Sequence, residues 1–263
     1  MLLLAGIAAA PILSAFWPAE AARWAEARAI DRALQGDTAG AVALLSEALQ
    51  EYPENVVFLW RRGVWRMELE DYDGALEDLQ KAAELEPDNF ALAQEEIAAL
   101  QHLGRHDEAI EKLQLWREKE IIQARPKSRA IVLNALAYIQ AVGDRDLEEA
   151  LEHVEEAIRI HGATLERLDT RGYIHSKLGN VVEAHEDLEK AVAEALKQLE
   201  LAQRNRVYVD ADEYAELVHK IKKNCAILIY HRMLLHAKNH TPAAEQDRKR
   251  IIELGFEPNE HLF

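Results

Sequence analysis

The stretch YDGALEDLQKA, residues 72–82, decides how this chain folds. An earlier stretch, TAGAVALLSEA at residues 38–48, has the same residue types in the same order, so that Ala41 corresponds to Ala75. In both, a Gly-Ala pair is followed by apolar residues four and seven positions after the alanine. Side chains at this spacing lie on one face of an α-helix. Each stretch therefore predicts a helix with one face of small and apolar residues.

The interval between these two stretches recurs along the chain. It also separates Ala75 from Ala109, and Ala150 from Ala184 in the second half of the sequence. Ala, Leu and Glu are abundant, whereas Gly (11) and Pro (7) are sparse, which favours long helices over the turns of a β protein. A fixed period of about 34 residues indicates an array of helical repeats.

Each unit of the array has the pattern of a helix, a short turn and a second helix. Gly36, Gly104 and Gly179 fall at the expected junction, where a left-handed residue can end the first helix. Pro53 and Pro87 mark the end of a unit, because a helix rarely continues through proline. Small residues in the first helix should let the two helices approach closely: Ala29, Gly63, Ala137 and Gly172.

The run from Leu59 to Gly63, continued by DYDGA at residues 71–75 and by Ala82 and Pro87, resembles the tetratricopeptide repeat. That family has a small residue in the first helix, a glycine before the turn, and a spaced series of alanines and a proline after it. The resemblance implies an all-α fold, a right-handed α-solenoid of antiparallel helix hairpins. It also implies a protein that binds other polypeptides.

The segments at residues 134–138 and 168–172 look like variants of the same signature. Seven extra residues precede the fourth repeat, and the interval from Ala184 to Ala244 is almost twice the usual period, so the last repeats are elongated. We expect repeats at residues 22–55, 56–89, 90–123, 130–163 and 165–204, with a degenerate sixth at 211–256. The expected domains are an apolar N-terminal segment at 1–21, repeats one to three at 22–123, repeats four and five at 124–204, and an elongated C-terminal repeat at 205–263.

The first helix of each hairpin should line the concave wall of the solenoid. Aromatic side chains there would supply buried area, and amides would pair with the backbone of a bound peptide or helix. The alternative is that Trp60 and Tyr138 only complete the packing between repeats. Helical phase predicts these partner-binding residues: Arg23, Glu26, Trp60, Arg61, Gln94, Glu95, Asn134, Tyr138, Asp169 and Tyr173.

The charge of the expected groove bears on the partner. Some family members hold the acidic C-termini of chaperones in a clamp of Lys, Asn and Arg. The matching positions here are Glu26, Ile30, Arg61, Ala91 and Glu95, so the clamp is absent. The acidic groove residues favour a basic or mixed protein partner.

Several classes of function are excluded by composition and motif. Asp and Glu number 47 against 31 Lys and Arg, a net charge of −16 that would repel nucleic acid. The sequence has no Gly-rich phosphate loop, nucleophile elbow or His-Glu-x-x-His run, and the repeats take up nearly all of it. We therefore predict a non-enzymatic protein with no catalytic residues and no cofactor. Cys225, in an apolar run, is expected to be a buried, unreactive thiol.

The histidines near the C-terminus give a weaker signal. His236 and His240 have the i, i+4 spacing of metal ligands, and His231 is close in sequence. No third ligand accompanies the pair locally, so the sequence predicts no metal site.

The beginning of the chain, residues 1–17, is apolar, and small residues at positions 19 and 21 suit a signal peptidase. This pattern predicts a signal peptide or short anchor over residues 1–21, and an exported or membrane-associated protein close to the membrane. No Lys or Arg lies near Met1, so the alternative is a cytoplasmic protein whose first segment packs on repeat one.

We expect a protein-interaction adaptor. Two alternatives remain open: a structural protein that self-associates through its elongated helices at residues 188–238, and an accessory subunit of a cell-envelope complex.

Overall fold

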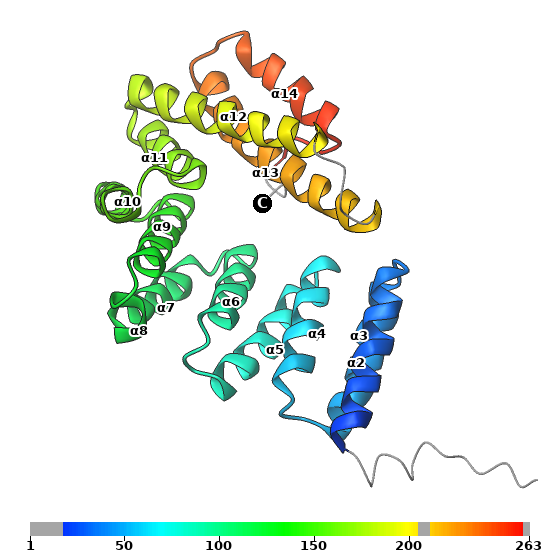
Figure 1. Cartoon of the computed structure of the whole chain (residues 1–263). Coiled ribbons are helices and arrows are strands. Elements are labelled where there is room, and N and C mark those ends of the chain that lie inside the picture. Colours follow the sequence, from blue (N-terminus) through cyan, green and yellow to red (C-terminus); the bar gives the residue numbers. More distant parts are fainter. Residues whose placement is uncertain (1–17, 205–210, 260–263) are drawn as a thin grey trace, which may run out of the picture. The chain divides into compact units, whose positions relative to one another are not determined.

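The computed structural model describes residues 18–204 and 211–259. All regular elements within these ranges are helices, and they follow one another as hairpins (Figure 1). The predicted all-α class of helix hairpins is therefore confirmed. The apolar segment at residues 1–17 lies outside the described residues, so its assignment as a signal or anchor stays a prediction. None of the described helices is long and apolar enough to cross a bilayer.

The described helices follow one another in chain order, and a short helix, α8, comes before α9. They are α2 (Pro18–Leu34) and α3 (Thr38–Glu51), α4 (Val56–Glu68) and α5 (Tyr72–Leu85), α6 (Phe90–His102) and α7 (His106–Glu118), α8 (Glu120–Gln123), α9 (Pro126–Val142) and α10 (Leu147–His161), α11 (Leu165–Leu178) and α12 (Val181–Arg204), and α13 (Ala211–Lys238) and α14 (Ala243–Leu254). The described residues form two compact units, the first ending at Ala109 and the second beginning at Ile110.

The contact between the two helices of a hairpin depends on small residues. The repeated alanines at positions 41, 75, 109, 150 and 184 are fully buried. A Cβ on Gly63 would lie 2.7 Å from Leu79 Cγ, and one on Gly172 would lie 2.8 Å from Leu188 Cγ. The predicted close approach is confirmed, because these glycines leave no room for even one methyl group.

Two kinds of glycine lie in and just after the turns. Gly36, Gly104 and Gly179 have φ angles of 81°, 68° and 84°, the left-handed conformation expected at the end of a first helix. Gly74 is helical, and its amide donates to the capping carboxylate of Asp71 at 3.2 Å. A Cβ on Gly74 would lie 2.4 Å from Asp71 Oδ2, so the glycine of the YDGA stretch makes space for the cap.

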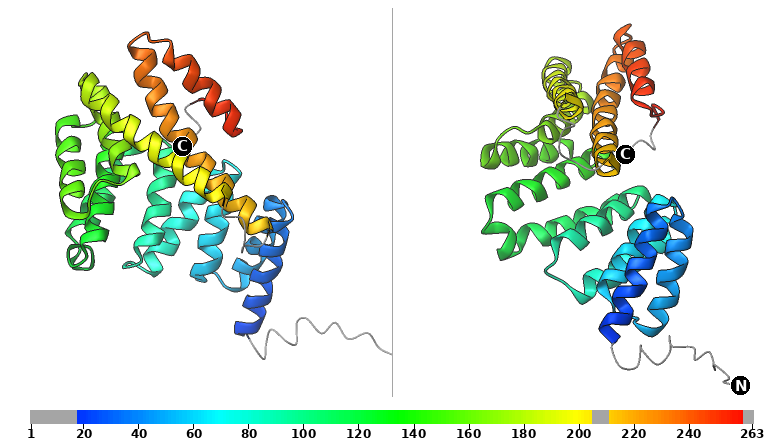
Figure 2. Two further views of the ribbon diagram at one scale, coloured as in Figure 1. Left: turned by 45° about the horizontal axis from the view of Figure 1, so that its top comes forward. Right: turned by 45° about the vertical axis from the view of Figure 1, so that its right-hand side comes forward.

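One helix in each of the last two hairpins is longer than the other helices. α12 has 24 residues and α13 has 28, and the two pack side by side (Figure 2). Cys225 of α13 is 1% exposed within the core that these helices share with α14. The expected burial of this cysteine is confirmed, and burial raises the pKa of its thiol, which disfavours the reactive thiolate.

Candidate functional site

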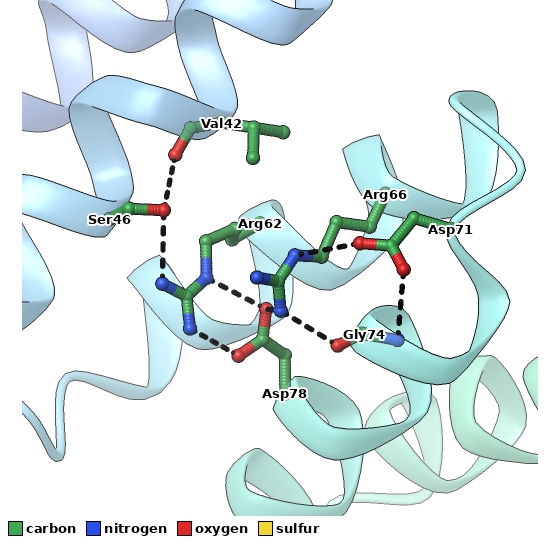
Figure 3. Close-up of polar contacts among 7 residues, drawn as sticks. All are labelled: Val42, Ser46, Arg62, Arg66, Asp71, Gly74 and Asp78. Atoms are coloured by element: carbon green, nitrogen blue, oxygen red, sulfur yellow. Dashed lines mark hydrogen bonds and ion pairs between the residues drawn. The ribbon is translucent and has the colours of Figure 1, made fainter.

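One polar device recurs inside the hairpins. In α4 and α5, Arg62 donates from Nε and Nη2 to the two carboxylate oxygens of Asp78, at 2.8 and 2.6 Å. Arg66 Nη1 donates to the same carboxylate at 2.8 Å, and Arg62 also reaches Ser46 Oγ at 3.1 Å (Figure 3). Asp78 is 2% exposed, so its charge is compensated almost entirely by these guanidinium groups.

Two later hairpins contain the same arrangement, which we call the Arg–Asp clasp. Arg171 of α11 binds Asp187 of α12 at 2.6 and 2.8 Å. Arg232 of α13 binds Asp247 of α14 at 3.2 and 2.6 Å. Because the clasp links the two helices of a hairpin in both units, it belongs to the scaffold rather than to a ligand site.

In the first unit, three predicted wall residues come together. Arg61 of α4 donates from Nε to Glu26 Oε1 of α2 at 2.8 Å, and its guanidinium lies 5.3 Å from the centre of the Trp60 ring. All three side chains are partly exposed. This Trp60 cluster joins the first helices of two consecutive hairpins, as a continuous binding wall requires.

The other predicted residues of the first unit lie outside the Trp60 cluster. Arg23 is exposed on α2 and pairs with Glu20 of its own helix at 3.0 Å. Gln94 and Glu95 lie on α6, where Gln94 is exposed and Glu95 is half-buried. Burial raises the pKa of the Glu95 carboxyl, because desolvation disfavours its charged form.

In the second unit, the predicted tyrosines form part of a row of rings. Tyr138 of α9 and Tyr173 of α11 have ring centres 6.5 Å apart, and His231 of α13 stacks on Tyr173 at 4.7 Å. His231 Nδ1 lies 2.8 Å from both oxygens of the fourth predicted residue, Asp169. Asn134 lies one helical turn before Tyr138 and is half-buried. We call Tyr138, Tyr173 and His231 the aromatic row.

The aromatic row has a polar border. Lys177 Nζ lies 5.3 Å from the centre of the Tyr173 ring and donates to Asp144 Oδ1 at 2.6 Å. Burial raises the pKa of the Tyr173 hydroxyl, so the ring stays neutral at any physiological pH. His231 is 2% exposed, which leaves no room for a substrate between it and Asp169. The border of the row therefore combines two tyrosine rings with one cation, a chemistry suited to contact with a partner.

The structure changes the electrostatic expectation for the wall. Two of its predicted carboxylates are already paired inside the chain, Glu26 with Arg61 and Asp169 with His231. Neither is available as a full charge for a basic partner. No sequence signal marked His231 as a member of the row, because α13 belongs to the repeat that breaks the regular period.

Comparisons with known proteins agree with this architecture. The sequence model of the tetratricopeptide repeat matches residues 56–89, which are α4 and α5 with their turns. No curated protein matches the chain. The solved structures below have low sequence identity to this chain, so they bear on the fold alone.

A tetratricopeptide repeat protein from Parabacteroides merdae aligns with a TM-score of 0.57 at 14% identity, over 91% of this chain and 94% of that one. MamA from Desulfovibrio magneticus aligns with a TM-score of 0.55 at 19% identity, over 67% of this chain and 96% of that one. PilF of Pseudomonas aeruginosa gives 0.53 at 16% identity, over 90% of this chain and 89% of that one. Residues 56–89 thus match one tetratricopeptide repeat, and the described residues share the fold of successive helix hairpins with these solved structures.

Proposed function

We propose that this chain is a non-enzymatic protein-interaction scaffold that holds a peptide or helix of a partner against the first helices of its hairpins. Tetratricopeptide repeats are interaction modules. The small residues of this chain are buried between the helices of each hairpin and cannot contact a partner. The side chains left on the first helices are then what a partner meets. Affinity would come from a few ring contacts at the centre of the bound segment.

The observation that carries this proposal is the aromatic row of the second unit. Tyr138 and Tyr173 are only partly buried although they belong to consecutive hairpins and lie within 6.5 Å of each other. Rings that offer area with few rotatable bonds are efficient anchors for a partner. The cation of Lys177 beside Tyr173 favours a partner segment that carries apolar residues next to a carboxylate or a backbone carbonyl.

The Trp60 cluster supports a second contact area on the first unit. Its Glu26–Arg61 pair is internally neutral, so the indole is the main source of binding energy there. Each unit thus has one ring-based contact area of its own.

A display library of random peptides, selected on the immobilised full chain, tests the proposal without knowledge of the partner. Enriched peptides should bind wild type and lose about 30-fold in affinity with Tyr138→Ala or Trp60→Ala, the size of a hot-spot loss. Each substitution reports on the unit in which it lies. The matched control is Leu115→Ala, since Leu115 is 71% exposed on a second helix, α7.

The helical circular dichroism of each variant should equal that of wild type. The proposal would be contradicted if both ring variants bound the peptides as tightly as wild type. It would also be contradicted if Leu115→Ala lost as much affinity as the ring variants.

Self-association is the second candidate function. Leu201 near the end of α12 and Leu217 near the start of α13 are 46% and 47% exposed, on the elongated helices themselves. Light scattering coupled to size exclusion separates the two. A monomer at all micromolar concentrations favours the scaffold, whereas a dimer that Leu201→Glu dissociates favours self-association.

A further inference from the structure

Three potential metal ligands meet between α12 and α13. His185 and Glu189 are one helical turn apart on α12, and His236 is on α13. One ligand atom from each lies within 4.8 Å of the others, and His185 Nε2 is 3.8 Å from Glu189 Oε1. Two imidazoles and one carboxylate are a ligand set that zinc accepts, with a fourth position left for water.

The buried member of the trio is already oriented. His236 Nδ1 lies 2.9 Å from Asp247 Oδ2, and Asp247 is 4% exposed. An ionised carboxylate only accepts hydrogen bonds, so in the neutral imidazole the proton lies on Nδ1 and Nε2 has the lone pair that can bind a metal. A carboxylate behind a histidine in this way fixes the tautomer and increases the basicity of the ligating nitrogen.

Arg232 completes the support around the trio. It donates to both oxygens of Asp247 and, from Nη1, to Glu189 Oε2 at 3.0 Å. Glu189 Oε1, the oxygen nearer to His185, is not used by this contact. The two carboxylates and the one guanidinium leave one negative charge in excess, which a divalent cation would offset.

The site is open on one side. The side chains of His185 and Glu189 are 54% and 43% exposed, so an ion can reach them from solvent. Zinc binds N and O ligands at about 2.0–2.2 Å, so two ligand atoms of one tetrahedral site lie roughly 3.5 Å apart and the trio must draw together on binding. His185 can supply that movement, because its side chain is 54% exposed and its ring centre already lies 5.8 Å from that of His236.

We propose that His185, Glu189 and His236 bind a divalent transition-metal ion of the zinc type, which ties α12 to α13. The pair noted in the sequence, His236 with His240, is not the one that the fold brings together. His240 lies in the turn after α13 with a φ of 54°, whereas the other two ligands lie on α12. This site is independent of the ring-based surfaces proposed for partner binding.

Titration of the metal-free full chain with Zn²⁺, followed by calorimetry, tests the site. One tight equivalent is expected, and Co²⁺ in its place should give the visible absorption of a four-coordinate ion. His185→Ala and Glu189→Gln should each weaken binding at least tenfold. Asp247→Asn should weaken it about 10- to 100-fold through His236, as expected for a residue that orients a ligand.

Two comparisons keep the test decisive. His219→Gln and His240→Gln, which change exposed histidines outside the trio, should bind like wild type. Zn²⁺ should also raise the Tm of wild type but not that of His185→Ala, a variant whose exposed position keeps the fold intact. Unchanged affinity in both His185→Ala and Glu189→Gln, or an equal loss in the two controls, would overturn the proposal.

Discussion

Two hairpins with the same small-residue interface have different side chains at the buried position three residues after the repeated alanine. In α4 and α5, the residue three positions after Ala75 is Asp78, which is held by two arginines. In α9 and α10, the residue three positions after Ala150 is His153, which is held by Gln140. The comparison shows that this position can be filled either by a buried charge or by a neutral, hydrogen-bonded side chain.

In the α9–α10 hairpin, the buried polar group is a neutral histidine, His153, in one tautomer. His153 Nδ1 lies 3.0 Å from the amide oxygen Gln140 Oε1, which only accepts, so Nδ1 is the donor. Its Nε2 lies 3.1 Å from Arg117 Nη1, which only donates. Burial lowers the pKa of His153, and the charge of Arg117 lowers it further. The first hairpin is thus held by buried charge and the second by a histidine that must stay neutral.

The largest expected effect comes from removing the buried carboxylate of the α4–α5 hairpin. Asp78→Ala leaves Arg62 and Arg66 without their shared carboxylate, and loss of one partner of a buried pair costs about 3–5 kcal/mol. Urea unfolding of the full chain, read as a change in the free energy of unfolding, measures this. Asp73→Ala is the control, because Asp73 is exposed in the first turn of α5, and it should stay within about 0.5 kcal/mol of wild type. A loss below about 1 kcal/mol for Asp78→Ala would show that the clasp is incidental.

A smaller effect tests the close helix approach in α4–α5 and, in the second unit, in α11–α12. Gly63→Ala puts a methyl group 2.7 Å from Leu79 Cγ, and overpacking of this kind costs about 1–3 kcal/mol. Gly172→Ala, 2.8 Å from Leu188 Cγ in the second unit, should cost a similar amount in the same unfolding assay. If either substitution is tolerated with no loss, the helix pair can separate and the close approach is not required.

The smallest expected effect is a pH dependence of stability that His153 gives to the α9–α10 hairpin. The folded chain holds His153 neutral, whereas the unfolded chain takes up a proton near the ordinary pKa of 6.5. Stability from this residue is therefore complete above pH 6.5 and falls as the pH drops toward the lowered folded pKa. His153→Gln should reduce the loss of stability between pH 7.5 and 5.5, measured by the midpoint of urea unfolding. His219→Gln, on exposed α13 surface, should leave the pH dependence of wild type unchanged.

The sequence predicted the hairpins well because their signals are local. The spacing of Ala75, Leu79 and Ala82 needs only helical geometry, and it placed the buried face correctly. The same reasoning put Tyr138 and Tyr173 on neighbouring first helices, where the structure brings their rings together.

The parts that the sequence missed depend on pairings between distant residues. Arg62 and Asp78 lie on different helices of a chain in which 30% of residues are charged, so nothing marked them as partners. His231 joins the aromatic row from α13, beyond the long helices that interrupt the repeat period. The division of the chain at Ala109 lies inside α7, where Ala109 and Leu113 follow the ordinary series and Trp116 replaces its next small residue.

The capping of α5 has a consequence for anyone who would redesign this scaffold. Tables of helix propensity recommend alanine over glycine inside a helix, by about 1 kcal/mol. At Gly74 the added methyl group would strike the Asp71 carboxylate, and loss of such a cap costs about as much. The two residues therefore have to be transplanted together, and an engineered repeat that improves one alone gains nothing.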